Sequence, residues 1–365
     1  MKKIAILGAG NAGCLTALHY YYYGKDMFEI TIYHDPDTPI ERVGQGTTLR
    51  VATLISKLFD LNLAERNLIQ ATRKEGILYE NWGKKKSKIY HSFPISLGAI
   101  HYSPHLLSTL ILESGLFKVE HKKVKNPESE IDSDYIFDCR GRHGRDASKY
   151  DTLINPINSA ILSRSDRMSD SKFTGTIATP NGWTFVIPNH DSTSYGYLYN
   201  SDITTKKDAK KDFMQRFDVI PDGYLSFQNY LAKNCFVGER TILNGNKLSF
   251  LEPLEATSTD LYLYMCRISW DHITNGIDKS LCNEAIRAQV FKLQKYILWH
   301  YQFGSAYDTP FWEYAKSLPF ETDAEFDGYL QIAKNTTFAE IQRIYADIEY
   351  AQWPVYSFKN WIENV

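Results

Sequence analysis

The sequence predicts an α/β fold in which a parallel sheet is followed by an antiparallel sheet and a helical C-terminal part. Three observations support this prediction. The short apolar run Lys3–Leu7 passes directly into a glycine-rich turn and then a helical segment. Residues 154–236 are mostly of alternating, strand-like character. After Asp260, apolar residues recur with helical spacing.

The first element is a β-α-β unit. Lys3–Leu7 reads as a buried parallel strand, and the following helix has an apolar face and is expected to end at Gly24 as a left-handed cap. Phe28–Tyr33 reads as the next strand. Because the crossover between two such strands is right-handed, the unit is the beginning of a Rossmann-like parallel sheet.

The later elements follow from the same patterns. Helices are expected over Leu49–Leu63 and Pro104–Leu116, and extended segments over Gly76–Trp82, Ile89–Phe93 and Asp134–Cys139. The lysine triplet at 84–86 is expected to be a solvated turn. The runs IATPNGWTFVIPNH and SYGYLYN predict paired antiparallel strands, and Ser280–Phe303 predicts the longest helix.

Composition excludes several functional classes. The 365 residues include 41 basic and 43 acidic residues, which gives a net charge of −2. The protein therefore has no overall positive field that would attract nucleic acid or an anionic membrane. Five scattered cysteines without a C-x-x-C pair, and histidines without clustering, argue against a disulfide framework and a metal site. No apolar run reaches the roughly 18 residues of a membrane span, and no export signal is recognisable, so a cytoplasmic location is expected.

The glycine-rich turn matches the dinucleotide-binding fingerprint. In Gly8-Ala9-Gly10-Asn11-Ala12-Gly13, the first glycine makes the tight turn, the second admits a pyrophosphate, and the third lets helix and strand approach. The helix N-terminus adds free N–H groups and partial positive charge. His34, followed by Asp35, stands where an acid normally holds the ribose. The fingerprint alone fits FAD and NAD equally.

Several segments, taken in order, resemble the flavin-dependent halogenases, whose best-known members act on tryptophan. These segments are Gly8–Gly13, Val43–Leu49, Thr72–Trp82, Asp138–Gly141, Trp183–Pro188, Gly196–Tyr199, Gly245–Asn246, Phe250–Thr257, His300–Tyr301 and Thr309–Trp312. Gln45, Leu49 and Phe185 depart from the family pattern. The stretch after Trp312 is shorter than in the tryptophan-specific members, which favours an open site for phenols, indoles or a larger scaffold.

The resemblance implies a FADH2- and O2-dependent halogenase that forms hypohalous acid at the flavin. It assigns Lys74 as the relay to an electron-rich aromatic substrate, a task suited to a buried amine of lowered pKa. Glu255 would stabilise the cationic ring and take its proton, with Glu252 as the competing carboxylate. The fixed φ of Pro253 should aim these two acids differently.

The resemblance also implies the binding residues and partners. FAD would be held by Gly8, Gly10, Asn11, Ala12, Gly13, His34, Gly46, Thr47, Gly141, Gly245, Asn246 and Leu254. Chloride, bromide or iodide would bind at Thr257 and Ser258, and Trp183, Phe185 and Pro188 would separate flavin from substrate. The expected partners are a small aromatic substrate and a separate reductase that supplies FADH2.

Two alternatives remain open from the sequence. One is a flavin monooxygenase that hydroxylates its substrate, and the other is a non-catalytic flavoprotein that has lost activity.

The predicted organisation is discontinuous: residues 1–50, 95–150 and 236–275 form the FAD-binding module, and residues 51–94, 151–235 and 276–365 form the substrate-side module.

Overall fold

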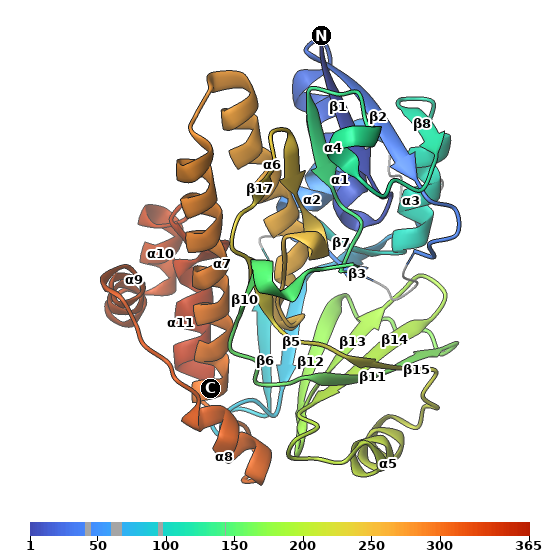
Figure 1. The fold of residues 1–365 in the computed structure, drawn as a ribbon. Helices are drawn as coiled ribbons and strands as arrows, with labels where there is room; N and C mark the ends of the chain where they lie inside the picture. The colour runs from blue at the N-terminus through green and yellow to red at the C-terminus, as the bar shows by residue number, and fades with distance from the viewer. Residues whose placement is uncertain (41–44, 60–67, 94–97, 143) are drawn as a thin grey trace.

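The computed structural model describes residues 1–40, 45–59, 68–93, 98–142 and 144–365, and within them the predicted α/β class is confirmed. A parallel sheet, a larger mainly antiparallel sheet and a group of C-terminal helices lie together in one body (Figure 1). One large cluster of buried side chains draws residues from all three parts.

The Rossmann-like sheet has six strands in the order β17-β18-β9-β1-β2-β8. They are β1 (Lys2–Leu7), β2 (Phe28–His34), β8 (Lys118–His121), β9 (Tyr135–Asp138), β17 (Phe236–Val237) and β18 (Thr241–Leu243). All neighbouring strands are parallel except β17 and β18. Strands β8 and β9 are joined through α4 (Pro127–Glu130).

Helix α1 (Asn11–Gly24) connects β1 to β2 as predicted, but Gly24 is not a left-handed cap. Gly24 is the last residue of the helix, and Lys25 after it keeps right-handed dihedrals. A Cβ on Gly24 would lie 2.4 Å from Cδ2 of Phe28 and 3.0 Å from the Trp270 ring. Glycine is therefore required there by close packing rather than by a positive φ.

The second sheet has seven strands in the order β15-β11-β14-β13-β12-β5-β6. They are β5 (Gly76–Glu80), β6 (Lys88–Ser92), β11 (Ser159–Ser165), β12 (Phe173–Thr179), β13 (Gly182–Pro188), β14 (Thr193–Tyr199) and β15 (Gly223–Ser226). The predicted antiparallel pairing is confirmed for β11 to β15, whereas β5 joins β12 in parallel.

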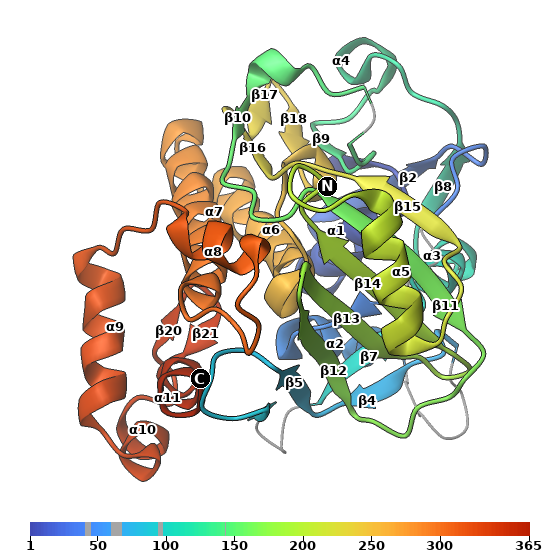
Figure 2. The same cartoon turned by 90° about the horizontal axis from the view of Figure 1, so that it is seen from below.

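Helix α5 (Lys206–Phe217) interrupts the segment for which only strands were predicted. The Thr205 side chain accepts a hydrogen bond from the Asp208 N–H and caps the helix. Ala209 and Phe213, four residues apart, bury one face of α5 against the sheet. Figure 2 shows α5 lying across β11 and β14.

Smaller elements join the two large sheets. Strands β3 (Gln45–Gly46), β7 (Ala99–Tyr102) and β4 (Thr72–Lys74) form one small sheet, and β10 (Tyr150–Thr152), β16 (Tyr230–Ala232) and β19 (Ser249–Phe250) form another. Helices α2 (Leu49–Leu58) and α3 (Pro104–Glu113) begin as predicted. Residues 60–63 of the predicted helix, and Val43 and Gly44 of the family-like segment, lie outside the described residues.

The C-terminal part is helical, as predicted. It contains α6 (Thr257–Asn275), α7 (Lys279–Gln302), α8 (Pro310–Ser317), α9 (Ala324–Asn335), α10 (Phe338–Ile344) and α11 (Val355–Asn364), together with the short pair β20 (Glu349–Tyr350) and β21 (Trp353–Pro354). Before this helical part, short 3-10 turns cover Ala147–Lys149, Gly245–Lys247 and Leu254–Ala256. Helix α7 is the longest helix described.

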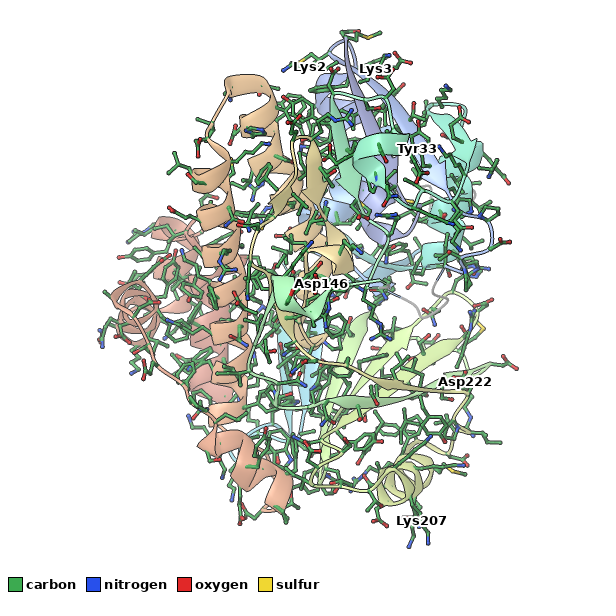
Figure 3. The ribbon with its side chains drawn as sticks, in the orientation of Figure 1. Lys2, Lys3, Tyr33, Asp146, Lys207 and Asp222 are labelled. Carbon is green, nitrogen blue, oxygen red and sulfur yellow. The ribbon has the colours of Figure 1, made fainter. Side chains whose placement is uncertain are left out.

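The exposed lysines at 84–86 form the expected turn and contact the C-terminal part through Asp308, Ile362 and Asn364. Lys3 on β1 and Lys207 on α5 lie at opposite ends of the molecule (Figure 3). No described helix is both long and apolar enough to cross a bilayer.

Candidate active site

The fingerprint glycines meet the steric demands of a dinucleotide turn. Gly8 has φ +98°, and a Cβ on Gly13 would lie 1.8 Å from the Gly8 carbonyl oxygen. A Cβ on Gly10 would meet no atom of the described residues within 4 Å, so these residues leave space beside the backbone at this point. Among the residues that the structure describes, no side chain caps the N-terminus of α1. The turn therefore fits a bound pyrophosphate.

Two further glycines surround this turn. Gly245 (φ +65°) lies so close that a Cβ would be 2.5 Å from Ala12 Cβ, and Gly141 (φ +73°) follows β9 with open space beside it. Asn11 and Asn246 are oriented by tyrosines: the Tyr102 hydroxyl donates to Asn11 Oδ1 at 2.8 Å, and the Tyr262 hydroxyl to Asn246 Oδ1 at 3.3 Å. Leu254 is fully buried.

His34 ends β2 next to the fingerprint turn. Burial lowers the pKa of its imidazole, which is therefore neutral at pH 7. The Asp35 carboxylate accepts hydrogen bonds from the Asp37 N–H and the Thr38 hydroxyl, and Lys123 lies 3.5 Å away. Asp35 is thus engaged within its own turn.

A cavity between the small β3-β7-β4 sheet, the seven-stranded sheet and the start of α6 gathers the other predicted side chains. It is lined by Gln45, Gly46, Lys74, Ile77, Thr174, Thr176, Trp183, Phe185, Ile187, Pro253, Glu255, Ala256, Ser258 and Thr259. Trp183 and Phe185, two residues apart on β13, both face it. Pro188 ends the same strand, and its carbonyl accepts from the Thr72 hydroxyl at 3.0 Å.

Lys74 is buried, with 2% of its surface exposed. Its Nζ donates to the Thr47 carbonyl oxygen at 3.1 Å and lies 5.3 Å from the centre of the Phe93 ring. Burial lowers the pKa of the Lys74 ammonium to about 8, and the nearby charge of Glu255 opposes part of that shift. The neutral, nucleophilic form of this amine therefore becomes a substantial fraction at mildly alkaline pH.

Glu255 lies in a turn with strained backbone. It has φ 69° and ψ 6°, and Ala256 after it also has left-handed dihedrals. Such dihedrals cost a non-glycine residue roughly 1 kcal/mol or more each. The carboxylate accepts from the Tyr79 hydroxyl and, at 2.8 Å, from Trp353 Nε1, and His300 Nε2 lies 3.0 Å from Oε1.

Glu252, on the other side of Pro253, has different partners. The Tyr301 hydroxyl donates to its Oε1 at 2.5 Å, and Trp183 Nε1 donates to the Tyr301 oxygen at 2.9 Å. Oε2 of Glu252 has no partner in the described part of the chain. Burial raises the pKa of the Glu252 carboxyl to about 8, so the group is protonated at pH 7. Glu252 is not among the residues that line the cavity.

The buried Glu252 predicts a pH dependence of stability. Its pKa is 4.5 in the unfolded chain and about 8 in the folded protein, so the folded state binds the proton more tightly. The resulting stabilisation is present below about pH 4.5 and is lost as the pH rises to about 8. Urea unfolding at pH 5 and pH 8.5 should show a larger loss of stability in the wild type than in Glu252→Gln. Equal losses would contradict this assignment.

The start of α6 lies at the cavity. Ala256 at its N-cap offers no side-chain hydrogen bond, so the first backbone N–H groups of the helix, at Thr257 and Ser258, lack a side-chain cap. Asp260 in the first turn is paired instead with Arg50 at 3.0 Å and accepts from the Thr48 hydroxyl at 3.1 Å. The helix end can therefore receive a small anion.

Three side chains that contact Glu255 were not predicted as its partners: Tyr79, His300 and Trp353. The stretch after Trp312 reaches this site, because β21 carries Trp353 to the Glu255 carboxylate. Arg50 on α2 pairs with Glu349 of the same strand pair and holds it in place. No group of three metal-ligating side chains occurs in the part of the chain that the structure describes.

Comparison with known proteins decides the family. The family model for tryptophan halogenase matches residues 3–107 and 116–361. The chain belongs to the tryptophan halogenase family. It is thus an enzyme, a flavin-dependent halogenase. Among curated proteins, the tryptophan 7-halogenase RebH of Lentzea aerocolonigenes is 24% identical over 87% of this chain and 79% of its own length.

Solved structures of halogenases share the fold. The tryptophan halogenase from Shewanella frigidimarina superimposes with a TM-score of 0.81 at 17% identity, covering 100% of this chain and 88% of the other. BrvH, a flavin-dependent halogenase from Brevundimonas sp., gives 0.79 at 16% identity, covering 99% and 90%. At these identities the likeness establishes the architecture of this halogenase, whereas the roles of its side chains must be argued from its own geometry.

Proposed function

We propose that this halogenase depends on FADH2 and O2, and that Lys74 relays hypohalous acid to an electron-rich aromatic substrate. The observation that carries the proposal is the burial of Lys74, with its lowered pKa, in one cavity with Glu255. A neutral amine can hydrogen-bond hypohalous acid or form a haloamine with it. The cavity wall, which includes Trp183, Phe185 and Ile187, limits the escape of this oxidant into water.

FAD would be held by the fingerprint turn and its surroundings. The residues concerned are Gly8, Gly10, Asn11, Ala12, Gly13, His34, Gly46, Thr47, Gly141, Gly245, Asn246 and Leu254. When bound in its reduced form, FAD supplies, with O2, the oxidant that turns a halide ion into hypohalous acid. In this proposal, the predicted FAD-binding module (1–50, 95–150, 236–275) binds the flavin, and the predicted substrate-side module forms the substrate's side of the site.

Halide and organic substrate are assigned different residues in this proposal. The N–H groups of Thr257 and Ser258 at the start of α6 receive chloride, bromide or iodide. Trp183 and Phe185, with Pro188 at the end of their strand, keep the organic substrate away from the flavin. Glu255 stabilises the cationic ring formed by halogen attack and takes up its proton.

The substrate is a neutral aromatic molecule, such as a phenol or an indole, rather than a free amino acid. Apart from Lys74 and Glu255, the described cavity lining contains no charged side chain. Recognition of an amino acid requires paired charges, whereas apolar walls such as Ile77, Phe185 and Ile187 suit an uncharged ring. A separate flavin reductase supplies FADH2.

The function is tested by incubating the protein with reduced FAD, O2, a mixed aromatic library and each halide in turn. Mass spectrometry should detect halogenated phenols or indoles, and no product without halide. Products that carry a hydroxyl group instead would contradict halogenation. Conversion of free tryptophan alone, at one ring position, would contradict the proposed substrate class.

His34 makes a testable contribution to cofactor affinity. A neutral imidazole at the ribose position lacks a charge-assisted hydrogen bond, and Asp35 is engaged in its own turn. FAD should therefore bind but be lost on purification. His34→Glu should tighten FAD about 10-fold, the equivalent of about 1.4 kcal/mol. Fluorescence quenching titrations measure both dissociation constants, and equal values would refute the role of His34.

A further inference from the structure

The Glu255 carboxylate is surrounded by groups from three elements that are distant in the sequence. The Tyr79 hydroxyl on β5, Trp353 Nε1 on β21 and His300 Nε2 on α7 surround the carboxylate. Glu255 and His300 are both buried, with side-chain exposures of 4% and 1%. The Trp353 indole is fixed by stacking on Tyr296, with ring centroids 3.8 Å apart and an angle of 17°. Both carboxylate oxygens are therefore occupied by protein groups.

The hydrogen bonds of His300 determine where its protons lie. Nδ1 is 2.8 Å from the Tyr296 carbonyl oxygen, which can only accept, so Nδ1 carries a hydrogen. Nε2 faces Oε1 of Glu255 at 3.0 Å. A bare imidazole nitrogen and a carboxylate oxygen are both acceptors and would repel each other at this distance, so one of the two groups carries a proton. The pair is either imidazolium with carboxylate or imidazole with carboxylic acid.

The surroundings favour the charged form of the pair. The Tyr79 and Trp353 donors both stabilise an ionised carboxylate, because hydrogen bonds donated to a charged oxygen favour that charge. The titratable groups facing the pair are Lys74 on β4, Tyr79 on β5, His91 on β6 and Tyr296 on α7. His91 is neutral at pH 7, since burial lowers its pKa to about 4, and so adds no charge there.

Lys74 is not the counter-charge of this carboxylate. Its Nζ donates to the Thr47 carbonyl oxygen, and no ion pair joins it to Glu255 in the described part of the chain. The proposed chemistry needs Lys74 as a neutral amine. In the neutral form that the proposed chemistry uses, Lys74 cannot compensate the charge of a buried carboxylate, so another cation must do so in that form.

We propose that His300 is this cation: it carries the proton shared with Glu255 and keeps the carboxylate ionised while Lys74 is neutral. His300 is a positioning residue, since it acts through Glu255. An ionised Glu255 can take up the proton that leaves the halogenated ring, whereas a carboxylic acid cannot. The catalytic part of this inference rests on the proposed function, but the protonation state of His300 does not.

The test is nitrogen NMR of the full-length protein labelled with ¹⁵N in its histidine rings. The His300 resonances, identified by their loss in His300→Gln, should show both ring nitrogens protonated at pH 7. In Glu255→Gln the same resonances should change to a neutral ring protonated only at Nδ1. A neutral His300 in the wild type at pH 7 would overturn the proposal, whatever the activity of the protein.

Two controls keep the experiment decisive. If His300→Gln does not fold, as judged by circular dichroism, Glu255→Gln identifies the resonances by their shift. His91→Gln serves as the matched variant of a second buried histidine, and the His300 resonances should remain those of an imidazolium. Where halogenation is detected, His300→Gln should lower kcat with little change in KM and alter its pH profile, and an unaltered profile would remove His300 from catalysis.

Discussion

Lys74→Ala is expected to abolish halogen transfer while leaving FAD affinity and the oxidation of reduced flavin by O2 unchanged. The amine acts after the oxidant has formed, and alanine removes the only buried lysine that lines the described cavity. Product formation is measured by mass spectrometry, flavin binding by fluorescence titration and flavin oxidation by absorbance. Product above the level obtained with free hypohalite would remove Lys74 from the mechanism.

The matched control is Lys84→Ala, which truncates an exposed lysine paired with Asp308 and should leave turnover unchanged. The pH profile gives an independent check on the active amine. With a pKa of about 8, only about a tenth of Lys74 is neutral at pH 7, so the rate should rise between pH 7 and pH 9. A rate that falls over this interval would show that the ammonium form is the active one.

Glu255→Gln is expected to slow halogen transfer by about 10²- to 10⁴-fold, the usual effect of losing a general acid or base. Glutamine keeps the size of the side chain and an oxygen that accepts hydrogen bonds, but it cannot carry the charge or take up the ring proton. The rate is measured at saturating aromatic substrate with excess reduced FAD. The effect should appear in kcat.

Glu252→Gln is the matched control for this carboxylate, because the two acids flank Pro253 and Leu254 in the same turn. Glu252 accepts from Tyr301 and does not line the cavity, so its replacement should leave turnover close to that of the wild type. Unchanged turnover in Glu255→Gln together with a large loss in Glu252→Gln would transfer the role to Glu252.

Most of the fold could be predicted because its signals are local. The β1-α1-β2 unit is visible as an apolar run, three spaced glycines and a second apolar run within 34 residues. Helix α5 was missed although Ala209 and Phe213 carry helical spacing, because polar residues dominate this short stretch between strands. The parallel pairing of β5 with β12 joins segments about 100 residues apart in the sequence, and no local sequence pattern predicts such a pairing.

The candidate site was predictable only in part. Lys74, Trp183 and Glu255 could be named because each lies in a segment that resembles the halogenases, and all three line one cavity. The partners of Glu255 could not, because Trp353 follows it by 98 residues and Tyr79 precedes it by 176. His300 lies in a resembling segment, yet only the packing of α7 brings its Nε2 to the carboxylate.

The same separations set the order in which the enzyme becomes competent during folding. The fingerprint turn itself lies within one local β-α-β unit, whereas the Glu255 carboxylate is held through loops of about 100 residues or more on either side. Such long-range closures form late, because their entropic cost precedes the contacts that repay it. In a partly folded chain, the nucleotide-binding turn can therefore be formed while the Glu255 carboxylate is not yet held in place. Halogenation then requires the fully native molecule.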